Sequence, residues 1–238
     1  MKVNASNFRI KTWQFKHFIC RLKRRKVLEK RKPNRSQAIY TTDPDGRFIT
    51  LEDLKQFPNL TRLSLTYDTE AMTDEEKEDL KQLHPKNVQM LSETLPDLPK
   101  LKELDLTYFD YFENVDFLSE CDQIETLEIR YNKIQNIDGI KEMKNLHVLD
   151  LRANPFTDLS PLTELDNLEI LILDMVPAEN PEVLKSLPSL RMLVLSPQNP
   201  EQEIVLNELK NSRRRCLHEY NQDAYDKNWS FSVLRDGK

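Results

Sequence analysis

A short apolar phrase recurs along this chain at a nearly constant spacing. Its core is a pair of leucine or isoleucine residues separated by one residue, and successive pairs begin 41, 23, 22, 22 and 22 residues apart. The pairs are Leu63/Leu65, Leu104/Leu106, Leu127/Ile129, Leu149/Leu151, Leu171/Leu173 and Leu193/Leu195. A constant period of this length is the sequence signature of a stacked repeat architecture.

Each repeat unit contains two kinds of local pattern. Leu149 and Leu151 alternate as they would in a short, half-buried strand. Apolar residues then return every three positions, which is typical of helical or 3₁₀ turns, at Leu159, Leu162, Leu165 and Leu168. The preceding unit repeats this template with Asn132, Ile134, Ile137, Ile140, Met143 and Leu146. We therefore expect each unit to be a strand followed by a turned return segment.

This template resembles the leucine-rich repeat family over roughly residues 51–200, and it is most similar to the 22-residue SDS22-like and internalin-like subclass. The resemblance implies an α/β fold, a solenoid with a short parallel sheet on its concave face, a helical or 3₁₀ convex side and helical caps. In this family an asparagine after the strand satisfies backbone groups at the turn, and Asn132 and Asn154 fit. Other residues stand there in the remaining units, where we expect less regular turns: Asp68, Phe109, Val176 and Gln198.

The repeats, residues 51–199, are expected to lie between two terminal caps. Residues 1–50 are predicted to form an N-terminal cap from a basic amphipathic helix and a β-hairpin around the DPDG turn, over 37–50. Residues 200–238 are predicted to form a C-terminal cap helix, over EQEIVLNELKNSRRRCLHEY, and an aromatic tail. The 41-residue gap holds the helical pattern TDEEKEDLKQLHP and indicates one enlarged or irregular unit.

Charge is distributed unevenly along the chain. Residues 1–35 hold 13 Lys/Arg and one Glu, a net charge of +12, whereas residues 36–238 carry −17. The apolar residues of this basic arm share one helical face, at Phe8, Phe15, Phe18, Ile19 and Leu22. Three interpretations stay open: a cap on the first repeat, an arm that binds nucleic acid or an anionic membrane, or an arm that lies on the acidic surface of the chain itself.

The residues that alternate with the inward leucines should face the concave surface, because successive strand side chains point to opposite sides. The first column reads Arg62, Glu103, Thr126, Val148, Ile170 and Met192. The second reads Ser64, Asp105, Glu128, Asp150, Ile172 and Val194, and the third Thr66, Thr107, Arg130, Arg152, Asp174 and Ser196. This face is therefore predicted to have a charged, solvated centre and an apolar end.

The apolar end of the face needs a cover, because contiguous apolar surface rarely stays bare on a monomer. A partner protein would serve, and so would the tail of the chain, through Trp229, Phe231, Val233 and Leu234. A second candidate surface is a tyrosine row on one rim, with Tyr67, Tyr108 and Tyr131, since tyrosine is enriched at binding sites.

Catalytic and cofactor sites are not indicated. The chain has only three glycines and lacks the GxGxxG and Walker patterns of phosphate-binding loops, and its four histidines form no metal-ligand spacing. We expect no enzyme activity, no cofactor and no metal. Cys20, Cys121 and Cys216 are odd in number and far apart, which favours free thiols in a reducing compartment. With neither a secretory signal nor a membrane span recognisable, the predicted location is cytoplasmic.

The sequence thus predicts a non-enzymatic module that binds a partner protein on its concave face, as an adaptor, a regulator or an immunity-type inhibitor. Carboxylates would engage a basic region, arginines would pair with acidic groups, and apolar residues would supply the desolvated anchor. The predicted binding residues are Glu103, Asp105, Glu128, Arg130, Asp150, Arg152, Ile170, Ile172, Met192, Val194, Tyr108 and Tyr131. The alternative is binding of an anionic membrane or nucleic acid through residues 1–35, with the repeats as scaffold.

Overall fold

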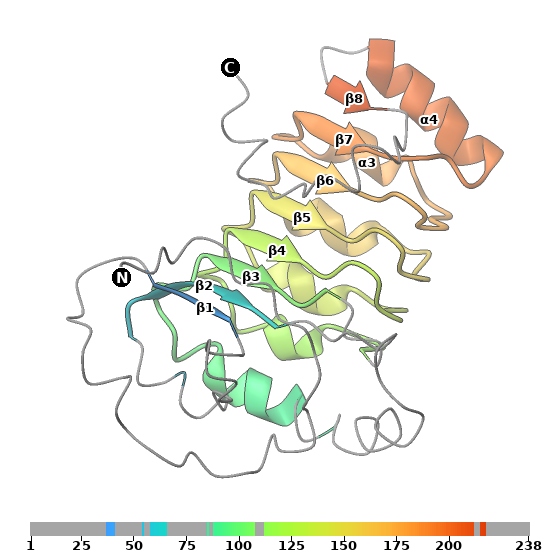
Figure 1. Cartoon of the computed structure of the whole chain (residues 1–238). Coiled ribbons are helices and arrows are strands. Elements are labelled where there is room, and N and C mark those ends of the chain that lie inside the picture. Colours follow the sequence, from blue (N-terminus) through green and yellow to red (C-terminus); the bar gives the residue numbers. More distant parts are fainter. Residues whose placement is uncertain are drawn as a thin grey trace, which may run out of the picture.

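A computed structural model describes residues 37–40, 54, 58–65, 85, 88–107, 112–211 and 215–217 of the chain. Its framework is a parallel sheet of eight strands that follow one another in sequence order (Figure 1). The strands are β1 (Gln37–Tyr40), β2 (Leu60–Ser64), β3 (Glu103–Asp105), β4 (Thr126–Glu128), β5 (Val148–Asp150), β6 (Ile170–Ile172), β7 (Met192–Val194) and β8 (Arg215–Leu217). The strands are short because the chain turns away towards the convex side directly after each leucine pair.

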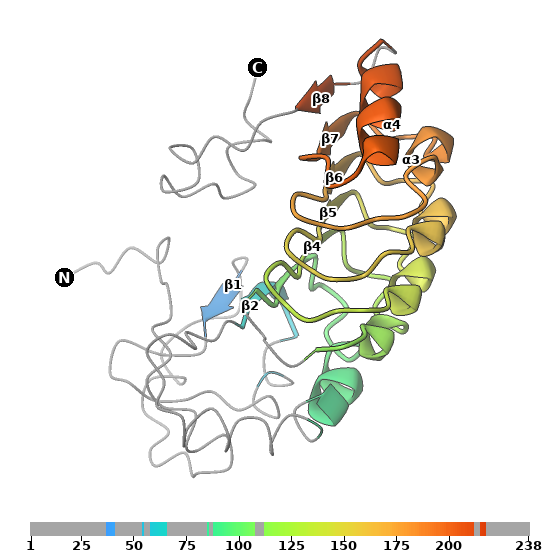
Figure 2. The ribbon, with the colours of Figure 1, turned by 90° about the vertical axis from the view of Figure 1, so that its right-hand side faces the viewer.

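Short helical segments form the convex side, opposite the strands (Figure 2). They are η4 (Asp116–Leu118), η5 (Asp138–Glu142), η6 (Ser160–Glu164) and α3 (Val183–Ser186). The apolar residues of strands and convex segments meet in one continuous core between the two sides. The predicted fold class, an α/β solenoid with a concave parallel sheet and a 3₁₀ or helical convex side, is confirmed.

A buried asparagine closes the turn after β4 and β5. The Nδ2 of Asn132 donates to the carbonyl oxygens of Leu106 and Ile129, at 3.0 and 2.8 Å. The Nδ2 of Asn154 donates in the same way to Ile129 and Leu151, at 3.0 and 2.9 Å. Each asparagine therefore joins its own unit to the preceding one through main-chain acceptors that would otherwise be buried without a donor.

The residue before the ladder position has a left-handed backbone in three successive units. Its φ angle is 56° at Tyr131, 54° at Ala153 and 60° at Met175. The third turn precedes Val176, where we expected less regular geometry, but it keeps the conformation of the other two. The carbonyl of Leu173, the counterpart of the Leu151 carbonyl that Asn154 binds, accepts from the N–H of Val176 at 3.1 Å instead. Nε2 of Gln202 donates to two carbonyls further along this segment, those of Val176 and Ala178, both at 3.0 Å.

A second ladder of short polar side chains starts the convex segments. The side-chain oxygens of Asn114, Asn136 and Asp158 accept from the N–H two residues on, at 3.2, 2.6 and 2.8 Å. The fourth equivalent position, Asn180, accepts from the N–H of Leu159 in the preceding unit at 2.8 Å. These positions are 22 residues apart, so the signal was present in the sequence, although our reading of the sequence did not use it.

The 41-residue gap between the first two leucine pairs is one enlarged unit. β2 pairs directly with β3, with Leu63 opposite Leu104, so no strand lies between them in the sheet. Residues 88–94 are helical instead, and Leu91, Leu95 and Leu98 are buried in the core. The predicted helix over TDEEKEDLKQLHP lies almost entirely outside the described residues.

The C-terminal end differs from the sequence prediction. Helix α4 (Pro200–Asn211) buries Val205, Leu206 and Leu209 against the last repeat, and Lys185 pairs with Glu208 at 2.7 Å. The prediction that this helix continues through Cys216 is wrong, because Arg215–Leu217 forms β8 and pairs in parallel with β7. The edge of β7 would otherwise present unpaired backbone groups, and β8 satisfies them.

At the N-terminal end, β1 pairs in parallel with β2 and extends the sheet by one strand. The second arm of the predicted hairpin, the amphipathic helix of residues 1–35 and the aromatic tail lie outside the residues that the structure describes. Within the part that it does describe, no helix is both long and apolar enough to cross a bilayer.

Candidate protein-binding surface

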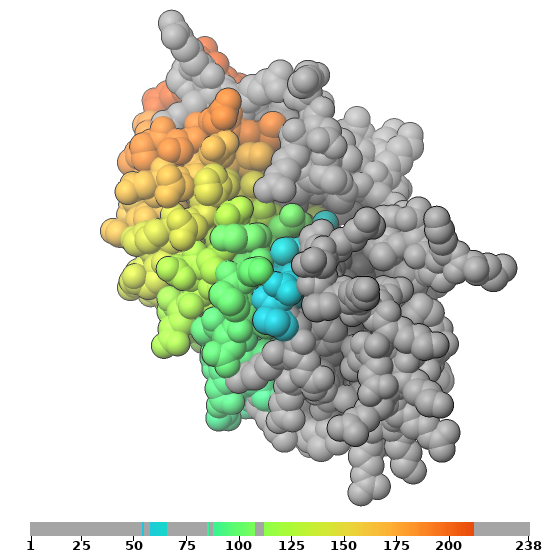
Figure 3. Space-filling model, turned by 90° about the vertical axis from the view of Figure 1, so that its left-hand side faces the viewer, coloured from blue at the N-terminus to red at the C-terminus, as the bar shows by residue number. Residues whose placement is uncertain are grey.

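The sheet register aligns the predicted columns of the concave face. In the first column, Glu103, Thr126, Val148, Ile170 and Met192 pair in that order across β3 to β7. In the second, Asp105, Glu128, Asp150, Ile172 and Val194 do the same. The pairing continues beyond the strands, where the N–H of Tyr131 and Ala153 donate to the carbonyls of Arg152 and Asp174. The surface is therefore built from one row of residues per unit, stacked in sequence order. Figure 3 shows the same succession of units from the flank of the solenoid, as bands of colour that follow the sequence.

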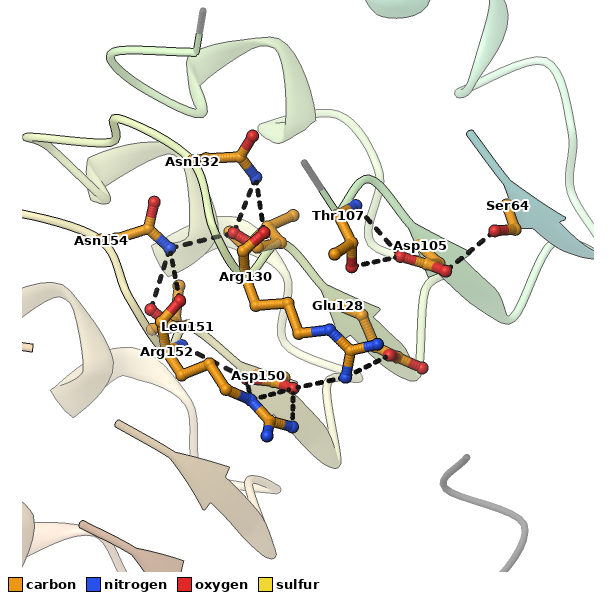
Figure 4. A network of polar contacts seen from close by, with 11 residues as sticks. Ser64, Asp105, Thr107, Glu128, Arg130, Asn132, Asp150, Leu151, Arg152 and Asn154 are labelled. Carbon is orange, nitrogen blue, oxygen red and sulfur yellow. Dashed lines mark hydrogen bonds and ion pairs between the residues drawn. The ribbon is translucent and has the colours of Figure 1, made fainter. Parts of the chain in front are cut away.

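Charged side chains of three adjacent strands form what we call the central ion cluster: Asp105, Glu128, Arg130, Asp150 and Arg152. The Nε of Arg152 donates to both carboxylate oxygens of Asp150, at 2.8 and 2.9 Å, and its Nη2 pairs with the same carboxylate. The Nη1 of Arg130 lies 3.4 Å from Asp150 Oδ2 and 3.5 Å from Glu128 Oε2 (Figure 4). Asp150 thus holds two arginines.

The sequence interpretation treated these carboxylates as a solvated surface, and this is wrong for two of them. Asp150 is 0% exposed and Glu128 is 6% exposed. The physical reason is the length of arginine: the side chains that follow each strand fold back over the carboxylates of their own and the next strand (Figure 4). The centre of the face is consequently a largely self-neutralised, desolvated network.

Glu128 is the member of this network whose negative charge is disfavoured. Burial and the neighbouring charge of Asp105 raise its pKa to about 8, and the nearby Arg130 only partly offsets them. Asp105 itself is held by neutral donors, with Ser64 Oγ at 2.8 Å and Thr107 Oγ1 at 2.6 Å. Arg130, the cation that pairs with Glu128, also pairs with Asp150, so its charge is shared between two carboxylates.

The apolar end of the face consists of Ile170, Ile172, Met192 and Val194 on β6 and β7. Three of these side chains are half-buried, and Ile172 is 3% exposed. Whether a partner or the tail covers them stays a prediction, because the tail lies outside the described residues. Of the predicted tyrosine row, Tyr131 is half-buried on the rim, and Tyr67 and Tyr108 lie outside the described part.

One residue of this surface stood in the third column but not among the predicted binding residues. Asp174 follows β6 and is 3% exposed, and its Oδ1 accepts no hydrogen bond from the described part of the chain. The sequence signals this position by a change in the sign of the charge, because the same column carries arginine in the two preceding units, at Arg130 and Arg152.

The described residues offer little for catalysis. They contain no group of three His, Cys, Asp or Glu that could hold a metal ion. Cys121 is a free thiol in the core, and burial together with Glu120 and Asp122 raises its pKa to about 12, so it stays protonated and unreactive.

Comparison with known families agrees with this architecture. The family model described as Leucine Rich repeats (2 copies) matches residues 122–164, which span β4, η5, β5 and η6. The described part of the chain has a leucine-rich repeat fold. Its 22-residue units with 3₁₀ convex segments are those expected for the SDS22-like and internalin-like subclass. Domains of this family are generally non-enzymatic modules for protein–protein interaction.

Solved structures with a similar fold include two internalins of Listeria monocytogenes str. 4b F2365. Internalin inlF has 19% sequence identity and a TM-score of 0.48, over 71% of this chain and 51% of that one. Internalin C2 (inlC2) has 21% identity and a TM-score of 0.37, over 66% and 81%. The leucine-rich repeat protein LIC12759 of Leptospira interrogans has 15% identity and a TM-score of 0.47, over 75% and 52%. The chain thus spans about half the length of the inlF and LIC12759 structures. None of the curated proteins compared with this sequence is significantly similar to it.

Proposed function

We propose that this protein binds a partner protein on its concave face, as an adaptor, a regulator or an immunity-type inhibitor, and does so in the cytosol. The observation that carries the proposal is the register of the columns, which joins the central ion cluster and the apolar end into one continuous surface. A desolvated charged centre beside partly exposed apolar side chains is the arrangement that gives interfaces both specificity and affinity.

The two parts of the surface have different roles in this proposal. Met192 and Val194 supply apolar area that a partner can remove from water, at about 25 cal/mol per Å². The central ion cluster contributes discrimination, because a partner has to meet its desolvated carboxylates and arginines with matching charges. We take the partner to carry a basic region opposite β3 to β5.

The test is affinity capture from native lysate with the full chain as bait, followed by mass spectrometry. The variant Met192→Glu/Val194→Glu puts charges on half-buried positions where water can still reach them. Ile172 is less suitable, since a glutamate there would be buried and would destabilise the fold. The matched control is Ile204→Glu, an exposed isoleucine on α4.

The expected result is a protein captured by wild type and by I204E and lost with the double variant, while circular dichroism shows both variants folded. A protein captured equally by all three baits would place the binding surface elsewhere. Binding that weakens steeply as ionic strength rises and disappears without residues 1–35 would instead favour the basic arm.

A further inference from the structure

Asp174 is a buried carboxylate that the described part of the chain leaves incompletely paired. The residue is 3% exposed, and its Oδ1 has no hydrogen-bond donor within reach. Removing an ionised oxygen from water without a compensating donor is unfavourable, and leaving a charged group unsatisfied costs more than leaving a neutral one. A fold that keeps such a group on a concave face has a position prepared for an external donor.

The arginines of the two preceding units contact a different carboxylate. In the two preceding units the third column carries arginine, and both Arg130 and Arg152 converge on Asp150 in the second column. At β6 the pattern reverses, with Asp174 in the third column and Ile172 in the second. Arg152 is the nearest cation in the column, and its Nε and Nη2 are directed to Asp150.

Apolar side chains adjoin Asp174, although its own column carries Arg152 in the preceding unit and Ser196 in the next. Ile172 precedes it on the same face of β6, Val194 pairs with Ile172 from β7, and Met175 follows it on the rim with 55% of its surface exposed. Apolar neighbours exclude water and lower the local dielectric, so a charge-assisted hydrogen bond to this carboxylate would be strong. The group is an anionic acceptor framed by apolar side chains.

We propose that Asp174 and the apolar end form a subsite for an arginine of the partner protein, flanked in the partner by an apolar residue. Arginine matches the site because its planar guanidinium donates to a carboxylate with two parallel bonds, and its weak hydration tolerates an apolar setting. The subsite rests on the proposed function, since it assigns one side chain of the partner that the concave face is proposed to bind.

The first test is thermal unfolding of the full chain. Asp174→Asn removes the buried charge, so the melting temperature should rise, by roughly 2–4 °C if about 1 kcal/mol is recovered. Asp150→Asn is the matched comparison and should lower it, because it leaves two arginines without their carboxylate. A D174N variant destabilised as much as D150N would show that Asp174 already has its donor in the free chain, which would overturn the subsite.

The second test is selection of a displayed library of random linear peptides on the immobilised full chain. Wild type and the control Asp166→Asn, an exposed carboxylate in the loop before β6, should both enrich peptides with an arginine next to an apolar residue. Replacing that arginine by citrulline, or Asp174 by asparagine, should weaken binding about 30-fold or more, the loss for one partner of a buried charge pair.

The outcomes separate the two proposals. Peptides without a basic residue, bound equally by D174N and lost with M192E/V194E, would keep the concave face as the binding surface and overturn the arginine subsite. Peptides whose binding is unchanged in both D174N and M192E/V194E would overturn the subsite and the proposed function together.

Discussion

At the scale of single residues, the main-chain packing between two units requires glycine at one position. A Cβ added to Gly139, in η5, would lie 2.2 Å from the carbonyl oxygen of Val115 and 2.6 Å from its carbon. These are backbone atoms of the preceding convex segment, which cannot rotate away as a flexible side chain would. Glycine is required here because the convex segments stack with their main chains in contact.

Gly139→Ala should therefore destabilise the protein by about 1–3 kcal/mol, the usual cost of overpacking a well-packed site. The measurement is chemical denaturation followed by circular dichroism. Lys141→Ala, on an exposed position of the same segment, is the control and should change the free energy of unfolding by less than about 0.5 kcal/mol. Equal small effects for both variants would mean that the units are not packed this closely.

The raised pKa of Glu128 makes a prediction about pH. Its pKa is about 8 in the folded state against 4.5 for the ordinary group, so between these values the folded state binds more protons than the unfolded state. The contribution of the protonated side chain to stability is complete below pH 4.5 and is lost as pH rises through 8. In Glu128→Gln the side chain does not titrate, so the loss of stability with rising pH that comes from this residue should disappear.

Unfolding free energies of wild type and E128Q across this range test the point. The difference between them should move in favour of E128Q as pH rises, by at most about 1.4 kcal/mol per pH unit. The exposed Glu142, replaced by Gln, provides the control and should run parallel to wild type. An E128Q curve that also runs parallel would show that Glu128 is ionised in the fold at neutral pH.

At the scale of elements, the two ladder asparagines, Asn132 and Asn154, link the turns that follow β3, β4 and β5. Asn154→Ala removes two buried donor bonds and the acceptor at 3.3 Å from the N–H of Ile134. We expect a loss of at least about 2 kcal/mol, because the orphaned carbonyls lie away from water. Asn167→Ala also removes a bond to the preceding unit, to Lys144, but at an exposed site, and should cost clearly less. If chemical denaturation showed similar losses of unfolding free energy for the two variants, the buried ladder would have no special role.

The sequence predicts the elements well wherever one residue type recurs at a fixed offset. The positions of β2 to β7 and the register of the columns follow from the leucine period, whereas the roles of Asn132 and Asn154 follow from the resemblance to the leucine-rich repeat family. The strand Arg215–Leu217 does not, because it is selected by an open sheet edge rather than by local pattern. The burial of Glu128 and Asp150 was also missed, since it depends on how far an arginine from a neighbouring strand can fold back. Whether the predicted residues bind a partner stays a prediction.

At the scale of the whole molecule, a solenoid is stabilised by contacts between neighbouring units and needs its ends covered. Helix α4 buries Val205, Leu206 and Leu209 at the C-terminal end, and Gln202 joins it to the preceding unit through the carbonyls of Val176 and Ala178. The result is a sheet whose concave columns keep their register over six adjacent strands, β2 to β7. A fixed surface of this kind suits recognition of a protein more than it suits chemistry on a small molecule.

The most direct test of the concave face is hydrogen–deuterium exchange of the full chain with and without the captured partner. The account predicts slower exchange in the peptides that contain β3 to β7, and unchanged exchange in those that contain η5 and η6 on the convex side. Protection confined to the convex segments, or to residues 1–35, would contradict it.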